Sequence, residues 1–134
     1  MVTGQACPFW VPLVEYNEAQ SPGADYFVKK YIGQLLEADP LIDTVILGCT
    51  HYPLLMDKIR QFMPPSVQII PQGGYVALSL ADYLQRHPDM RRRCATGGHT
   101  RYLTTEDPDK FGEQAQLFLG GNSITVENIT LEEP

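Results

Sequence analysis

The sequence is poor in positive charge and contains no long apolar run. Ten Lys and Arg residues stand against sixteen Asp and Glu residues, which gives a formal net charge of -6. This balance argues against a protein that binds nucleic-acid phosphates, because such proteins need a basic surface. No apolar run approaches the roughly 20 residues that span a bilayer, and the first residues do not join a basic region to an apolar one. The sequence therefore predicts a cytoplasmic protein that binds neither nucleic acid nor a membrane.

Cysteine is also scarce, with three residues in the chain. An odd number of cysteines without a secretory signal argues against a disulfide framework. Charged residues make up 19%, below the roughly 25% usual for soluble domains, which suggests that part of the surface faces a partner. With 134 residues and 43% hydrophobic residues, the chain has the length of one domain and enough apolar side chains for a core, so we do not expect disorder.

Four segments carry apolar residues at helical spacing, and a proline stands near the start of three of them. A proline costs nothing in the first turn, where its missing N–H would have no partner. Gly120 and Gly121 predict the end of the last helix. The four apolar faces consist of Val28, Ile32, Leu35 and Leu36; Leu55, Ile59, Phe62 and Met63; Val76, Leu80, Tyr83 and Leu84; and Phe111, Ala115, Phe118 and Leu119.

Short β-prone runs alternate with these helices, at residues 43–47, 67–70, 100–104 and 124–127. The first run is almost wholly apolar, as in a strand that is covered on both faces. Strands that alternate with helices of this length predict an α/β fold with parallel sheets. No strand of normal length precedes the turn-like residues 3–8, so we expect the chain to be a fragment of a longer protein.

Residues 47–53, Leu-Gly-Cys-Thr-His-Tyr-Pro, lie where an apolar strand ends and a helix begins. Ligands of open α/β sheets bind at this end of the strands, and the N–H groups of a helix N-terminus favour an anion. Cys49 is placed there to be partly thiolate, and His51 can relay its proton. Thr50 offers a hydroxyl and an N–H to the same ligand. Taken alone, Cys49 is as easily read as a buried packing residue, but its neighbours favour chemistry.

Two stretches resemble glutamate racemase, in the family order and at similar spacing. Residues 46–55, Ile-Leu-Gly-Cys-Thr-His-Tyr-Pro-Leu-Leu, look like the second cysteine motif of the family, and residues 6–15, Ala-Cys-Pro-Phe-Trp-Val-Pro-Leu-Val-Glu, resemble the segment before it. Relatives that act on aspartate tend to carry an acidic residue where this chain has His51, so the histidine favours glutamate. The resemblance is strong over residues 5 to 60 and weaker through to Pro134.

The resemblance implies a bacterial, cytoplasmic isomerase that interconverts L- and D-glutamate without a cofactor. The resemblance also implies that the enzyme supplies D-glutamate for the synthesis of peptidoglycan, which maintains cell shape. Cys49 resembles one of two catalytic cysteines that exchange the α-proton, one from each face of the α-carbon. His51 resembles the imidazole that assists it, and Glu15 the glutamate that orients this ring. Thr50 resembles a substrate-binding residue. For Glu15 alone, an exposed loop carboxylate is an equally good interpretation.

Much of the family pattern is absent from this sequence. The other cysteine, in an Asn-Thr-containing loop, and an aspartate near the family's N-terminus have no counterpart, so we expect the missing N-terminal half as a partner and an inactive isolated chain. Residues 1–65 should belong to the lobe that carries the motif, and residues 66–134 to the other lobe. Because these lobes are incomplete, we expect a homo-oligomer. Residues 69–74, Ile-Ile-Pro-Gln-Gly-Gly, stand where many members have an Asp-Ser-Gly turn.

Other functions and sites fit parts of the sequence. A non-catalytic interaction domain on the same scaffold and a Cys-His thiol hydrolase with Glu15 as third member are the alternatives to a racemase. The spacings of Cys49, His51, Cys94 and His99 do not match those of zinc sites, so we expect no metal. Cys7 and Cys94 are predicted to be buried apolar residues. The run Arg91-Arg92-Arg93 is predicted to be a solvated cluster at the end of a helix.

Overall fold

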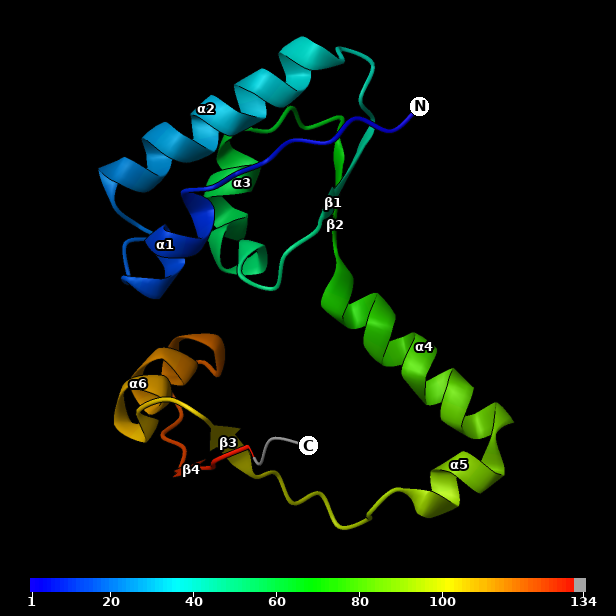
Figure 1. Ribbon diagram of the computed structural model, residues 1–134. Coiled ribbons are helices and arrows are strands. Elements are labelled where there is room, and N and C mark those ends of the chain that lie inside the picture. Colours follow the sequence, from blue (N-terminus) through cyan, green and yellow to red (C-terminus); the bar gives the residue numbers. More distant parts are fainter. Residues whose placement is uncertain (132–134) are drawn as a thin grey trace. The chain divides into compact units, whose positions relative to one another are not determined.

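The computed structural model of the chain describes residues 1–131 and divides into two compact units, Met1–Pro88 and Asp89–Pro134 (Figure 1). Within the described residues, no helix is long and apolar enough to cross a membrane.

The first unit contains a two-stranded parallel sheet and the helices that follow and precede its strands. Strand β1 (Thr44–Leu47) pairs with β2 (Gln68–Pro71), with Thr44 opposite Gln68 and Leu47 opposite Pro71. The connection between the strands is η1 (Tyr52–Leu55), a 3₁₀-helix, followed by α3 (Met56–Phe62). Two helices precede β1, α1 (Trp10–Glu15) and α2 (Pro22–Ala38). This β-α-β order is the parallel arrangement that the sequence predicts.

Helices α2 and α3 form the core of the first unit. Val28 of α2 and Leu55 and Ile59 of the η1–α3 segment are fully buried. Helix α2 begins where the Ser21 hydroxyl accepts a hydrogen bond of 3.2 Å from the Ala24 N–H, with a proline in its first turn, and such a cap satisfies an N–H that lacks a partner within the helix. The Lys58 ammonium lies 2.6 Å from the Asp25 carboxylate and joins α3 to α2.

The two faces of the β1–β2 sheet differ. Val45 and Ile69 face each other in register and pack against the core, whereas the side chain of Ile46, one residue on, is 62% exposed. Successive side chains of a strand point to opposite faces, so the helices of this unit cover one face. The prediction that both faces of this strand are covered is therefore wrong for this chain.

Helix α4 (Gln72–Arg86) begins directly after β2. Residues 69–74, which stand where many family members have a turn, are thus the end of a strand and the first turn of a helix. None of the residues of α4, all of which the structure describes, is buried. Its apolar residues include Val76, Leu78 and Leu80, which are exposed. The division of lobes at residue 65 stays a prediction about a longer protein, although β2 lies beyond that residue and pairs with β1.

The second unit contains a smaller parallel pair of strands and one longer helix. After the short helix α5 (Pro88–Arg93), β3 (Tyr102–Thr104) pairs with β4 (Val126–Asn128), and α6 (Pro108–Phe118) connects them. The Asp107 carboxylate caps α6 by accepting bonds from the N–H groups of Asp109 and Lys110. Gly112 of α6 is buried, and a Cβ there would lie 3.7 Å from the Val126 side chain.

The predicted helices and strands are present, with small shifts at their ends, and α1, α5 and η1 were not predicted. Gly120 and Gly121, both at positive φ, follow α6 as expected. Cys7 is buried, as predicted, but Cys94 is exposed. The prediction for Cys94 is wrong because this residue follows α5, a six-residue helix that buries none of its described side chains.

Candidate functional site

The Gly-Cys-Thr-His segment leaves the sheet at the carboxyl end of β1. Leu47, the last residue of β1, is buried, and four residues later His51 precedes η1. Cys49 therefore lies between the end of a parallel strand and the start of a helix, as the sequence predicts. This end of the strand is where α/β proteins bind ligands.

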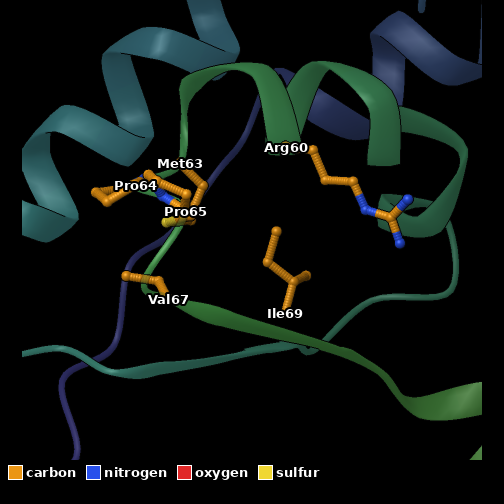
Figure 2. Close-up of a pocket in the computed structure, with 6 residues that line it drawn as sticks. All are labelled: Arg60, Met63, Pro64, Pro65, Val67 and Ile69. Atoms are coloured by element: carbon orange, nitrogen blue, oxygen red, sulfur yellow. The ribbon is translucent and has the colours of Figure 1, made fainter.

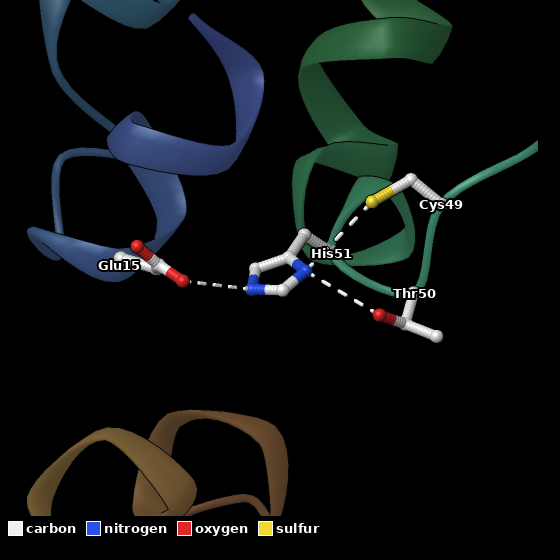
Figure 3. A network of polar contacts seen from close by, with 4 residues as sticks. All are labelled: Glu15, Cys49, Thr50 and His51. Carbon is white, nitrogen blue, oxygen red and sulfur yellow. Dashed lines mark hydrogen bonds and ion pairs between the residues drawn. The ribbon is translucent and has the colours of Figure 1, made fainter. Parts of the chain in front are cut away.

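The His51 ring lies between a carboxylate from α1 and two other side chains of this segment (Figure 3). His51 Nε2 lies 3.3 Å from Glu15 Oε1. On the other side of the ring, His51 Nδ1 lies 3.8 Å from Cys49 Sγ and 3.3 Å from Thr50 Oγ1. The structure thus brings together all four residues that the sequence singles out, Glu15, Cys49, Thr50 and His51.

The Glu15 carboxylate determines which nitrogen of a neutral His51 carries the proton. A carboxylate only accepts hydrogen bonds, so the nitrogen that faces it, Nε2, must be the donor. Nδ1 is then the acceptor, and it faces the Cys49 thiol and the Thr50 hydroxyl. The ring is thereby oriented to take a proton from Cys49, and the Glu15 carboxylate stabilises the imidazolium that results.

Glu15 reaches His51 because α1 packs on the start of η1. The Trp10 ring, at the first residue of α1, meets the Tyr52 ring edge to face, with centroids 4.8 Å apart and planes at 76°. Trp10 is 4% exposed and belongs to the core. Since α1 holds Trp10 at its start and Glu15 at its end, this aromatic contact and the His51–Glu15 pair join the same two elements at two points.

A second polar pair lies behind this contact. The Tyr52 hydroxyl hydrogen-bonds the Cys7 side chain. Burial raises the pKa of the Cys7 thiol to about 11, and the bond from Tyr52 offsets this rise only in part. Burial also raises the pKa of the Tyr52 phenol. Cys7 is therefore a neutral thiol at physiological pH, unlike a reactive cysteine, which needs thiolate character.

Sequence reasoning missed the contribution of Tyr52 and Trp10. Both lie in the two stretches that resemble the family, beside residues that were singled out. Their aromatic character was the available signal, but periodicity does not show that two rings distant in sequence meet.

The described residues contain a hollow away from the four site residues but no metal site. Within residues 1–131 no group of three His, Cys, Asp or Glu side chains is placed to hold a metal ion. A hollow of about 250 Å³ lies between α3 and β2 (Figure 2). Apart from Arg60, the residues that line it have apolar side chains, and none of them is one of the four site residues; the lining consists of Arg60, Met63, Pro64, Pro65, Val67 and Ile69.

Comparison with known proteins identifies similar sequences. No family model matches the chain. The glutamate racemase of Ruegeria sp. (strain TM1040) is 39% identical over 126 residues, which are 94% of this chain and 44% of that protein. The glutamate racemase of Lactiplantibacillus plantarum is 37% identical over 97% of this chain and 47% of its own length. The chain thus spans about half the length of the curated relatives it matches.

Solved structures agree with the sequence comparison. Glutamate racemase isoform RacE1 from Bacillus anthracis superposes with a TM-score of 0.79 at 31% identity, over 95% of this chain and 46% of that one. The resemblance to glutamate racemases and the α/β fold class are thereby confirmed. The predicted roles of Glu15, Cys49, Thr50 and His51 stay predictions.

Proposed function

We propose that this chain is the C-terminal part of a glutamate racemase, an isomerase that interconverts L- and D-glutamate without a cofactor. One observation carries the proposal. In a chain 39% identical to a glutamate racemase over 126 residues, a thiol, an imidazole and a carboxylate are aligned at the carboxyl end of a parallel strand. That alignment is what transfer of a proton to and from a thiol requires.

In this proposal Cys49 is the acid–base on one face of the α-carbon. His51 Nδ1 takes the Cys49 proton, and the thiolate then removes the α-proton of glutamate, which leaves a carbanion and a neutral thiol. The Glu15 carboxylate holds the imidazolium. Thr50 binds a polar group of the substrate at the helix start, where N–H groups favour a carboxylate. Each of these steps conserves the proton, so this face of the reaction needs no further acid or base.

Inversion requires a second acid–base on the opposite face. A single fixed base can only return the proton to the face from which it came. We place the second group, another cysteine, in an N-terminal part of the enzyme, and we expect the 134-residue chain alone to be inactive. In the cell, the product D-glutamate would serve peptidoglycan synthesis in a bacterial cytoplasm.

The surface of the first unit supports the need for a partner. Ile46 on the uncovered face of the β1–β2 sheet and the apolar residues of α4 are exposed. Exposed apolar surface of this kind marks contacts with other protein. We propose that the N-terminal part of the enzyme covers it, and that the isolated chain self-associates instead.

Complementation tests the proposal. The N-terminal part of the Ruegeria racemase is produced separately and mixed with this chain, and the conversion of L-glutamate into D-glutamate is measured by chiral chromatography. We expect activity only in the mixture, and none when the chain carries Cys49→Ala. Cys94→Ala is the matched control, because Cys94 is exposed and lies in the second unit.

The same samples distinguish the alternatives. Hydrolysis of an activated ester by the isolated chain, dependent on Cys49, would support a thiol hydrolase. A mixture that forms a stable complex but stays inactive with glutamate would support an interaction domain. Either result in place of racemisation would contradict the proposal.

A further inference from the structure

Two side chains, those of Cys49 and Thr50, can donate a hydrogen bond to His51 Nδ1. Thr50 Oγ1 lies 3.3 Å from His51 Nδ1, and Cys49 Sγ lies 3.8 Å from the same nitrogen. With the Nε2 proton directed at Glu15, Nδ1 has one lone pair in the ring plane and accepts one good hydrogen bond. The two donors therefore compete for a single acceptor.

The hydroxyl has the advantage in this competition. An O–H group is a stronger donor than an S–H group, and both groups lie within hydrogen-bonding distance of the nitrogen. While the Thr50 proton occupies Nδ1, this nitrogen is not available to take the proton of Cys49. In this arrangement the residues of the proton relay are in place, but Cys49 cannot transfer its proton to His51.

Thr50 is more exposed to solvent than Cys49, so an arriving ligand can reach the Thr50 hydroxyl. Thr50 is exposed, so its hydroxyl can turn toward an arriving ligand, whereas Cys49 is partly buried. A carboxylate offers the hydroxyl a charged acceptor, and such hydrogen bonds are about twice as strong as neutral ones. An anionic ligand can therefore draw the Thr50 proton away from the imidazole.

We propose that Thr50 gates the proton relay: its hydroxyl occupies His51 Nδ1 at rest, and the carboxylate of an amino-acid ligand takes that hydrogen bond and releases the nitrogen to Cys49. The ligand class rests on the proposed function, whereas the competition rests on the geometry alone. After release, the proton of Cys49 Sγ moves to Nδ1, which gives a thiolate and an imidazolium held by Glu15. The thiol is thus activated only when a ligand is present to be deprotonated.

The gate is tested by alkylation of Cys49 with iodoacetamide, which needs no racemase activity. The rate is followed on the 134-residue chain by mass spectrometry of the peptide that contains Cys49, as a function of pH. Thr50→Val removes the hydroxyl and keeps the shape, so Nδ1 becomes available to Cys49. Because one neutral hydrogen bond is displaced, we expect alkylation near neutral pH to be about two- to tenfold faster, with its half-maximal rate at lower pH.

Three further variants separate the gate from a change in access. Thr50→Ser, which restores a hydroxyl, should return the slow rate, and Thr50→Ala should behave like Thr50→Val. In a His51→Asn background, Thr50→Val should change nothing, because the contested nitrogen is gone. The titratable groups around the pair include Glu15 from α1, Tyr52 at the start of η1 and the neighbouring Cys7, and they are identical in all these variants.

Each outcome has a clear meaning. Alkylation that is unchanged or slower in both Thr50→Val and Thr50→Ala would overturn the gate. An acceleration of the same size in the His51→Asn background would also overturn it, because the effect would then be steric. Slow alkylation of the buried Cys7 in every variant confirms that the fold is intact. A failure of complementation with active Thr50 gating would refute the racemase proposal and leave the gate standing.

Discussion

The buried thiol of Cys7 should make the stability of the first unit fall at alkaline pH. Burial raises the pKa of this thiol from 9.0 to about 11. Below the lower value both the folded and the unfolded chain keep the proton, and the full stability is present. As the pH rises from the unfolded to the folded pKa, only the unfolded chain releases its proton, so the free energy of unfolding falls.

The size of this fall follows from the shift. Each pKa unit corresponds to about 1.4 kcal/mol, so the loss across this window is about 2–3 kcal/mol. The pKa of Tyr52 is also raised by burial, and its effect has the same sign at higher pH. For a domain with a few kcal/mol of stability, this loss is a large fraction of the total.

Urea unfolding at a series of fixed pH values measures this effect. Trp10 is the single tryptophan of the chain and is buried in the first unit, so its fluorescence reports the unfolding of that unit alone. Cys7→Ala should remove most of the loss, and Cys7→Ala combined with Tyr52→Phe should remove nearly all of it. Cys94→Ala is the control, because Cys94 is exposed. A full alkaline loss in the Cys7→Ala protein would refute the reasoning.

Three further predictions concern the core, a helix cap and the site. Ile59→Ala leaves a cavity at a fully buried position and should lower the free energy of unfolding by about 2–5 kcal/mol. Leu41→Ala, at an exposed position, is the control and should change this free energy by less than about 0.5 kcal/mol. Urea unfolding followed by Trp10 fluorescence compares the two variants, and equal losses of stability would contradict the assigned core. Asp107→Ala removes the side chain that caps α6 and should lower the free energy of unfolding by about 1 kcal/mol and reduce the helical circular dichroism signal. Asp107→Asn keeps a capping oxygen and should preserve both the stability and the signal. Identical behaviour of the two variants would contradict a stabilising role for the cap. In the complemented enzyme, His51→Asn should reduce kcat by about 10²–10⁴-fold, most in the direction that uses Cys49 as the base, while kcat/KM falls equally in both directions because the equilibrium constant of a racemisation is one; equal losses of kcat in both directions, measured by chiral chromatography from each enantiomer, would contradict this assignment.

Helices α2, α3, α4 and α6 were predictable because their apolar residues repeat at helical spacing and three of the segments have a proline near the first turn. Helices α1 and α5 have six residues each, too few for a periodic pattern. Helix α1 is held by a neighbouring segment, as the contact between Trp10 and Tyr52 shows. The exposure of Ile46 was also outside the reach of the sequence, since an apolar strand does not show which of its faces is covered.

The site was predicted in two different ways. Cys49, Thr50 and His51 are adjacent in sequence, and their position after an apolar strand is sufficient to place them together at the sheet edge. Glu15 came from the resemblance to the family, because its contact with His51 depends on the packing of α1 against η1. The contest between Thr50 and Cys49 for one nitrogen is a matter of side-chain geometry that spacing alone does not show.

The central claim is that Cys49 serves one face of the α-carbon, and hydrogen exchange in D₂O tests it most directly. The chain is combined with the N-terminal part of the Ruegeria racemase in which the cysteine proposed for the opposite face is replaced by alanine. L-glutamate and D-glutamate are then incubated separately, and deuterium at the α-carbon is measured by NMR. We expect exchange of one enantiomer only, without inversion, and none after Cys49→Ala; exchange of both enantiomers, or exchange that survives Cys49→Ala, would contradict the assignment.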